Sequence, residues 1–309
     1  MRIFYAIRHS LDPAKYYGGL RFIPDWLRES PVGRAYRSHR DLAIVRQWTE
    51  EDTSRQKFYS QFVQAGQVVF DIGANLGNRT KVFRRLGARV IAVEPQPRLA
   101  RALKRAYARD RGVCIIEAAV GSSPGEAQMF IAGVHALSSL SARWIENVRA
   151  SGRFQDVEWK QTTRVPVTTL DILIAHYGAP AFIKIDVEGF EYQVLAGLHT
   201  SVSALSFEFT PEMSSVAHSC VSYLEDLGMR EFNFAEGEAT ELRFQCWLTG
   251  RELERVLDVT RDLAIFTLAG TWRNGRHRHS IEFSMTSPRR TVREFKREDS
   301  GFAAIDKVR

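Results

Sequence analysis

The stretch VVFDIGANLG at residues 68–77 decides the fold. Its first four residues are typical of a buried strand, and the residues that follow Leu76 have helical apolar spacing up to Gly87, which ends the helix. Glycines between a strand and a helix permit positive φ angles and let a ligand approach the main chain. The start of a helix also offers unpaired N–H groups. The stretch therefore predicts a ligand-binding turn in an α/β domain.

Short apolar runs alternate with helical stretches on both sides of this turn, from residue 65 to residue 270. This alternation is typical of a mainly parallel sheet covered by helices on both faces, so we expect a Rossmann-like α/β domain. Thr249 and Glu252 form a predicted capping box ahead of a late helix. The predicted strands are residues 68–71, 89–94, 113–120, 181–186, 205–209, 230–234 and 264–269.

Four further segments complete the predicted organisation. Residues 1–64 form a helical, basic N-terminal segment, and residues 271–309 form a basic C-terminal extension. Residues 133–165 are too long for an ordinary connection, so we expect an insertion that acts as a lid. Residues 235–248 are predicted to form a hairpin.

The composition fits a globular protein with a substantial core, because 44% of the residues are hydrophobic and 26% are charged. The three cysteines are widely spaced, which argues against a disulfide framework and a zinc ribbon. No signal peptide or transmembrane run is visible, so a cytoplasmic location is expected. The net charge of +7 is concentrated in the two ends. Basic terminal segments are more often exposed to solvent than bound to a partner, and nucleic acid is not the expected partner.

The second predicted strand ends in an acidic residue that suggests a nucleoside ligand. Glu94 follows Gly73 by about 20 residues, the spacing at which a carboxylate can accept hydrogen bonds from both ribose hydroxyls. This arrangement serves NAD and S-adenosylmethionine alike. Asp71 favours the second, because its negative charge would repel a pyrophosphate but attract an ammonium and a sulfonium. Glu117 and Ala118, after the third strand, are suited to lining an adenine slot.

These features predict S-adenosylmethionine as the cofactor. Three alternatives remain: a dinucleotide-dependent oxidoreductase, which Asp71 and the missing third glycine oppose; a non-catalytic module that binds cofactor or anions; and a nucleic-acid methyltransferase. The predicted cofactor-binding residues are Asp71, Gly73, Asn75, Gly77, Glu94, Glu117 and Ala118.

The chain also resembles the FkbM family of methyltransferases from residue 68 to about residue 208. The segments that carry the resemblance are VVFDIGANLGNRT, VIAVEPQP, AAVGSSPGEAQMF, VTTLDIL, FIKIDVEGFEYQVLAGL and LSFEF, in the family's order. The resemblance implies a seven-stranded Rossmann-like sheet. It also implies methyl transfer, usually to a hydroxyl oxygen of a sugar, glycan or secondary metabolite. The first 60 and the last 40 residues do not take part in the resemblance.

A second group of polar residues surrounds the strand FIKID at residues 182–186. Strand alternation places Lys184 and Asp186 on one face, and a buried ammonium needs a carboxylate, for which Glu208 or Asp71 is the expected partner. A lowered pKa would instead make Lys184 a base. Asp186 is the first candidate for gripping the cofactor or removing the acceptor's proton, and Glu188 is the second. The candidate catalytic residues are Asp186, Glu188, Lys184 and Glu208.

Other ligands and bases have weaker support in the sequence. Asp186 and Glu208 could together hold a divalent cation, but no third ligand is evident, so a metal is not predicted. His135 and His218 are further candidate bases, although a lone histidine is more often a surface or packing residue. Glu191 is expected to lie in the first turn of a helix, where the dipole favours acids. The expected partner is a small-molecule or glycan hydroxyl acceptor, and nothing in the sequence indicates an oligomeric state.

Overall fold

The computed structural model describes residues 30–271, except 153, 155–156, 201, 237–238 and 260–265. Most of the predicted C-terminal extension and the first 29 residues of the predicted N-terminal segment lie outside the described residues. In the part that is described, no helix is both long enough and apolar enough to cross a membrane.

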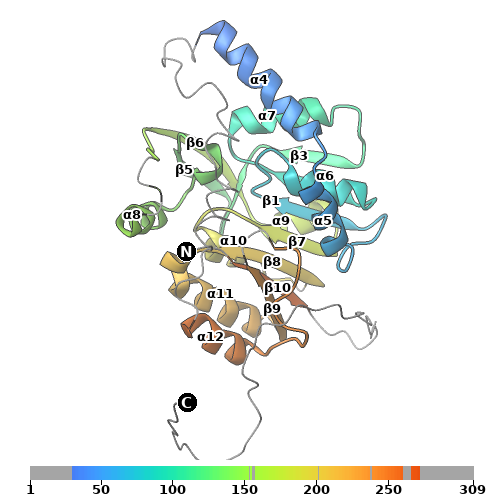
Figure 1. Ribbon diagram of the computed structural model, residues 1–309, viewed down its shortest axis with the longest axis vertical. Coiled ribbons are helices and arrows are strands. Elements are labelled where there is room, and N and C mark those ends of the chain that lie inside the picture. Colours follow the sequence, from blue (N-terminus) through green and yellow to red (C-terminus); the bar gives the residue numbers. More distant parts are fainter. Residues whose placement is uncertain are drawn as a thin grey trace, which may run out of the picture. The chain divides into compact units, whose positions relative to one another are not determined.

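The core of the structure is a seven-stranded sheet in which five neighbouring strands, β3, β2, β1, β7 and β8, run parallel (Figure 1). β10 pairs antiparallel with β8 on one side and with β9 on the other. The predicted Rossmann-like α/β class with a mainly parallel sheet is therefore confirmed. In spatial order the strands are β3 (Val113–Ile116), β2 (Arg89–Val93), β1 (Val68–Ile72), β7 (Phe182–Ile185), β8 (Ala204–Phe209), β10 (Phe266–Thr271) and β9 (Glu231–Glu236).

Helices cover both faces of this sheet. Alternation along β1 sends Val69 to one face, where it packs with α4, α5, α6 and α7, and sends Phe70 and Ile72 to the other, where they pack with α9, α10, α11 and α12. The helices are α4 (Pro31–Arg46), α5 (Glu50–Tyr59), α6 (Asn78–Arg85), α7 (Pro97–Ala106), α9 (Leu170–Tyr177), α10 (Glu191–Leu195), α11 (Ser214–Asp226) and α12 (Gly250–Val259).

Two predicted segments differ from the structure near the third strand. The predicted strand 113–120 is two strands, because Glu117 and Ala118 break it and β4 (Ala119–Val120) joins a separate sheet. That sheet has the order β4, β6 (Gln161–Thr168), β5 (Gly125–Ile131). The predicted insertion 133–165 is also structured, since it contains the 3-10 turn η2 (His135–Leu137), helix α8 (Ala142–Ser151) and the larger part of β6. Pro166 and the exposed polar residues of β6 concealed this strand in the sequence.

The predicted hairpin at 235–248 is wrong, because residues 239–248 form bends with a single isolated bridge from Leu248 to Phe232. The side chain of Asn233 explains the difference. Its Nδ2 donates to the carbonyl of Phe244 at 2.7 Å, and its Oδ1 accepts from the N–H of Phe244 at 3.2 Å, so an amide replaces a paired strand. The capping box at α12 is confirmed, with the Thr249 N–H donating to Glu252 at 2.9 Å and the Glu252 N–H donating to the Thr249 hydroxyl.

Helix α5 is fastened to α6 by a buried carboxylate. Asp52 accepts from the N–H of Thr49 in a capping box and contacts the Lys81 ammonium at 2.7 Å and the Arg55 guanidinium at 3.2 Å. Burial raises the pKa of Asp52, but hydrogen bonds from Lys81 and Thr49 outweigh burial, so the pKa lies below its ordinary value. Since α6 begins at the glycine turn, Asp52 connects the N-terminal helices to the residues around that turn.

We expect Asp52→Ala to lower the free energy of unfolding by about 3 kcal/mol, because it leaves two cations facing a buried site and removes a helix cap. Urea unfolding at neutral pH measures this loss. The lowered pKa means that the carboxylate stabilises the fold above its ordinary pKa, so the difference between the two proteins should shrink below about pH 4. A difference that stays constant with pH would contradict this role.

Candidate active site

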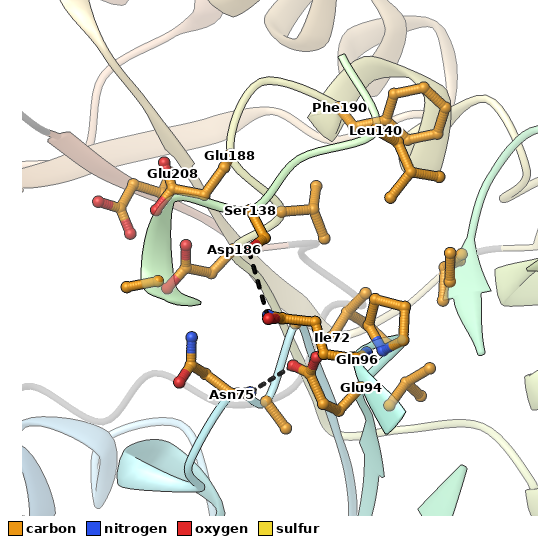
Figure 2. Close-up of a pocket in the computed structure, with 18 of the residues that line it drawn as sticks. Ile72, Asn75, Glu94, Gln96, Ser138, Leu140, Asp186, Glu188, Phe190 and Glu208 are labelled. Carbon is orange, nitrogen blue, oxygen red and sulfur yellow. Dashed lines mark hydrogen bonds between the residues drawn. The ribbon is translucent and has the colours of Figure 1, made fainter. Parts of the chain in front are cut away.

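A pocket opens at the carboxyl ends of β1, β2 and β7, the edge at which open α/β sheets bind ligands. Its empty volume, counted out to the open mouth, is about 1260 Å³. Figure 2 shows carboxylates from several elements around it, with Leu140 and Phe190 together on a different side. Nine of the eleven predicted site residues line it: Asp71, Gly73, Asn75, Glu94, Ala118, Lys184, Asp186, Glu188 and Glu208.

The glycine turn has left-handed backbone at three alternate positions, with φ of 79° at Gly73, 52° at Asn75 and 74° at Gly77. A Cβ at Gly73 would overlap the carbonyl oxygen of Asp186, so the turn needs glycine there to pack against the end of β7. Gly77 is the N-cap of α6, and a Cβ there would lie 2.8 Å from Leu103. Gly77 therefore shapes the turn and packs against α7 but does not line the pocket.

Glu94 is held by the main chain on both sides. One oxygen accepts from the N–H of Asn75 at 2.7 Å and the other from the N–H of Gln96 at 2.8 Å (Figure 2 marks the first). Burial nevertheless raises the pKa of Glu94 to about 7. Each carboxylate oxygen has a second acceptor site, so the group can still bind two hydroxyls of a ligand.

Asp71 is fully buried at the start of the turn and accepts a hydrogen bond from the Thr80 hydroxyl at 2.5 Å. Burial raises its pKa, and the charge of Lys184 and the bond from Thr80 only partly offset this effect. A buried carboxylate with a raised pKa gains from a cationic ligand, which lowers the cost of its charge.

Lys184 forms an ion pair at 2.5 Å with Asp186, which was not among the predicted partners, Glu208 and Asp71. The shared face that strand alternation gives to residues two apart explains the pair. Burial lowers the pKa of Lys184, but Asp186 and Glu208 outweigh burial, so the pKa is raised. The lowered pKa that a lysine base requires is therefore absent.

Glu188 has an unusual backbone conformation and an unusual environment. Its φ is 55°, which is rare for a residue other than glycine, and its carbonyl accepts from the Ser139 hydroxyl at 2.6 Å. Burial and the neighbouring charges of Asp186 and Glu208 raise the pKa of its carboxyl well above the ordinary value. Glu191 begins α10 and accepts from the N–H of Gly189, which agrees with its predicted structural position.

Some predicted residues lie elsewhere or differ in character. Glu117 points away from the pocket and pairs with Lys104 at 2.7 Å near the surface. His218 lies on α11, where Nδ1 is 2.8 Å from the carbonyl of Ser214. His135 does line the pocket, but burial, helped by nearby arginines, lowers its pKa to about 3, so its imidazole is neutral.

Several lining residues were not predicted. Gln96 connects the end of β2 to the insertion, because its Nε2 donates to the carbonyl of His135 at 3.0 Å and its Oε1 accepts from the Ser138 hydroxyl at 3.3 Å (Figure 2 shows the second bond). Its position directly after Glu94 and Pro95 was a usable signal in the sequence. Ser138 and Leu140 belong to the insertion, which was predicted to be a lid, but neither residue was singled out in the sequence.

No group of three or more histidine, cysteine, aspartate or glutamate side chains in the described residues has the arrangement of a metal site. The hypothesis that Asp186 and Glu208 share a cation therefore gains no third ligand from this part of the chain.

Comparisons with solved structures give distant similarities. A TehB-like S-adenosylmethionine-dependent methyltransferase from Corynebacterium glutamicum is 11% identical, with 79% of this chain and 100% of that chain covered and a TM-score of 0.42. Precorrin-6y C5,15-methyltransferase from Geobacter metallireducens is 12% identical, with coverages of 71% and 87% and a TM-score of 0.36. Aeropyrum pernix fibrillarin, which holds bound S-adenosylmethionine, is 12% identical, with 68% of each chain covered and a TM-score of 0.37.

No curated protein matches the sequence significantly. The family model described as the Methyltransferase FkbM domain, however, matches residues 71–231, which is more than half of the chain. The match begins at Asp71 and includes both the glycine turn and the acids after β7, which belong to two of the segments that carry the resemblance. This chain therefore belongs to the FkbM family of S-adenosylmethionine-dependent methyltransferases.

Proposed function

We propose that the chain transfers a methyl group from S-adenosylmethionine to a hydroxyl oxygen of a sugar, glycan or secondary metabolite. The observation that carries this proposal is the grouping of Asp186, Glu188 and Glu208 beside the glycine turn in one pocket (Figure 2). Carboxylates accept hydrogen bonds from hydroxyl groups and can remove their protons, whereas an anionic acceptor would be repelled from this group.

The pocket suits the cofactor's charges and shape. Asp71 can face the cationic methionine end, Glu94 can accept from the ribose hydroxyls, and the small side chain of Ala118 leaves room for the adenine. Gly73 and Asn75 shape the turn that brings these groups together. When bound, the cofactor supplies a methyl group on a positively charged sulfur, which is already a strong electrophile.

The protein must then align the acceptor and take its proton. Asp186 is neutralised by its ion pair with Lys184, which weakens it as a base and suits it to orienting the acceptor. Glu188 has a raised pKa, so its carboxylate is the stronger base. We assign proton removal to Glu188, and the orientation of the acceptor to Asp186, Lys184 and Glu208.

The proposal is tested by incubating the protein with S-adenosylmethionine and a panel of sugars, glycans and hydroxylated metabolites, with matched amines and carboxylates. We expect S-adenosylhomocysteine to accumulate with hydroxyl acceptors and their masses to rise by one methylene group. Methylation of the amines or carboxylates alone would contradict it.

Asp71→Asn should weaken the binding of S-adenosylmethionine by tenfold or more, because a charge-assisted contact is worth roughly 1.5–3 kcal/mol. Isothermal calorimetry measures the affinity. Glu117→Gln is the matched control, because that carboxylate lies outside the pocket, and it should bind as the unchanged protein does. Equal affinity in the unchanged protein and Asp71→Asn would remove Asp71 from the cofactor site.

Glu188→Gln should reduce kcat by on the order of a hundredfold or more while leaving cofactor affinity nearly unchanged, as expected for loss of a general base. The base acts only when deprotonated, so kcat/KM of the unchanged protein should fall as pH drops. Because the pKa of Glu188 is raised, this fall should begin at a higher pH than an ordinary glutamate gives. A pH profile that is identical in Glu188→Gln would assign the proton transfer to another group.

A further inference from the structure

Helices α4 and α7 form a strongly basic surface on one side of the sheet, and we call them the basic helix pair. They carry eight arginine and lysine residues but only one acid, Asp41. Much of this charge lies away from the pocket, because Arg34, Arg46, Arg101, Lys104 and Arg105 are all exposed.

The two helices form one continuous surface, which Figure 1 shows as neighbouring helices. Arg98 of α7 contacts Asp41 of α4 at 2.5 Å, and Arg105 donates to the Ser38 hydroxyl at 2.6 Å. Asp41 is therefore already paired.

Two further acids near the basic helix pair, within the described residues, are also paired. Glu117 pairs with Lys104 at 2.7 Å, and Asp110 pairs with Arg84 at 2.7 Å. Exposed Arg109 and Arg111, directly after α7, add further positive charge. The surface as a whole therefore has a positive field that attracts an anionic partner.

Helix α4 also exposes apolar groups within this field. Val32 is 75% exposed and Tyr36 is 55% exposed, and they lie four residues apart, on the same side of the helix. Exposed Ala35 and Ala43 continue this stripe toward the end of the helix, with exposed His39 between them. Apolar and aromatic side chains bordered by arginines are typical of helices that lie in the interface of a bilayer.

We propose that the basic helix pair docks on a membrane surface rich in anionic phospholipids. Charge complementarity supports this partner, because the exposed cations of both helices attract lipid phosphates. The aliphatic side chain of Val32 and the ring of Tyr36 enter the headgroup region, where Tyr is favoured. Single-stranded nucleic acid, the other polyanion, is bound through stacking platforms of several aromatic rings, and Tyr36 is the sole such ring in the exposed stripe. The inference is independent of the acceptor, since it concerns a surface outside the pocket.

The test is sedimentation of the full chain with vesicles of phosphatidylglycerol and phosphatidylcholine, compared with vesicles of phosphatidylcholine alone. We expect binding to the anionic vesicles alone, weakening as salt concentration rises. The double variant R101E/R105E should lower the partition coefficient by on the order of tenfold or more. V32S/Y36S should lower it as well, while leaving most of the salt dependence.

The matched control is R251E/R255E, which reverses two exposed arginines at the same spacing on α12. α12 packs by β9, and α7 packs by β3, so the two pairs lie at opposite edges of the sheet. The control should bind vesicles as the unchanged protein does. Calorimetry with S-adenosylmethionine checks that every variant is folded. Because it measures cofactor binding and not turnover, a failure of membrane binding can be told apart from a failure of methyl transfer.

Three results would overturn the proposal. The first is equal sedimentation with neutral and anionic vesicles. The second is equal loss of binding in R101E/R105E and R251E/R255E, which would mean that only the net charge of the protein matters. The third is tight binding of a single-stranded RNA oligonucleotide, lost in R101E/R105E, with no binding to vesicles, which would make nucleic acid the partner in place of the membrane.

Discussion

The close packing of the turn after β1 against the end of β7 is the constraint on which the site depends. The N–H of Asp186 donates to the carbonyl of Ile72 at 3.0 Å, which continues the parallel pairing beyond the strands. Gly73 follows at once, and its missing Cβ is what allows the carbonyl of Asp186 to lie against it. This contact brings the two acidic motifs of the family, separated by more than 100 residues, into one pocket.

The same packing determines the electrostatics of the pocket. The register of β1 and β7 places Lys184 beside Asp71, and strand alternation places Asp186 on the same face as Lys184. The Lys184 ammonium therefore lies close to several carboxylates. Burial makes the charge of these carboxylates costly and raises the pKa values of Asp71, Glu94 and Glu188, and neighbouring carboxylates add to the effect. A ligand that carries positive charge lowers this cost, which agrees with the cofactor of the family.

The sequence predicted the features that depend on local pattern. Apolar runs and the glycine turn identified the main strands, and the spacing from Gly73 to Glu94 placed the second carboxylate correctly at the pocket. Long-range contacts were harder to predict. The orientation of Glu117 depends on Lys104, which lies on a different element, and no local pattern encodes that ion pair. The sequence also did not predict the polar strand β6, because its outer face is exposed and it therefore lacks an apolar run.

The structured insertion is better understood as a wall of the site than as a detachable lid. Ser139 holds the carbonyl of Glu188, and Trp144 of α8 lies so close to Gly189 that a Cβ there would overlap the indole. Both contacts fall on the segment whose backbone is left-handed at Glu188, with φ of 55°. Such a conformation persists only where its surroundings maintain it, and here these surroundings come from the insertion. The segment that was expected to act as a lid therefore also orients the proposed base.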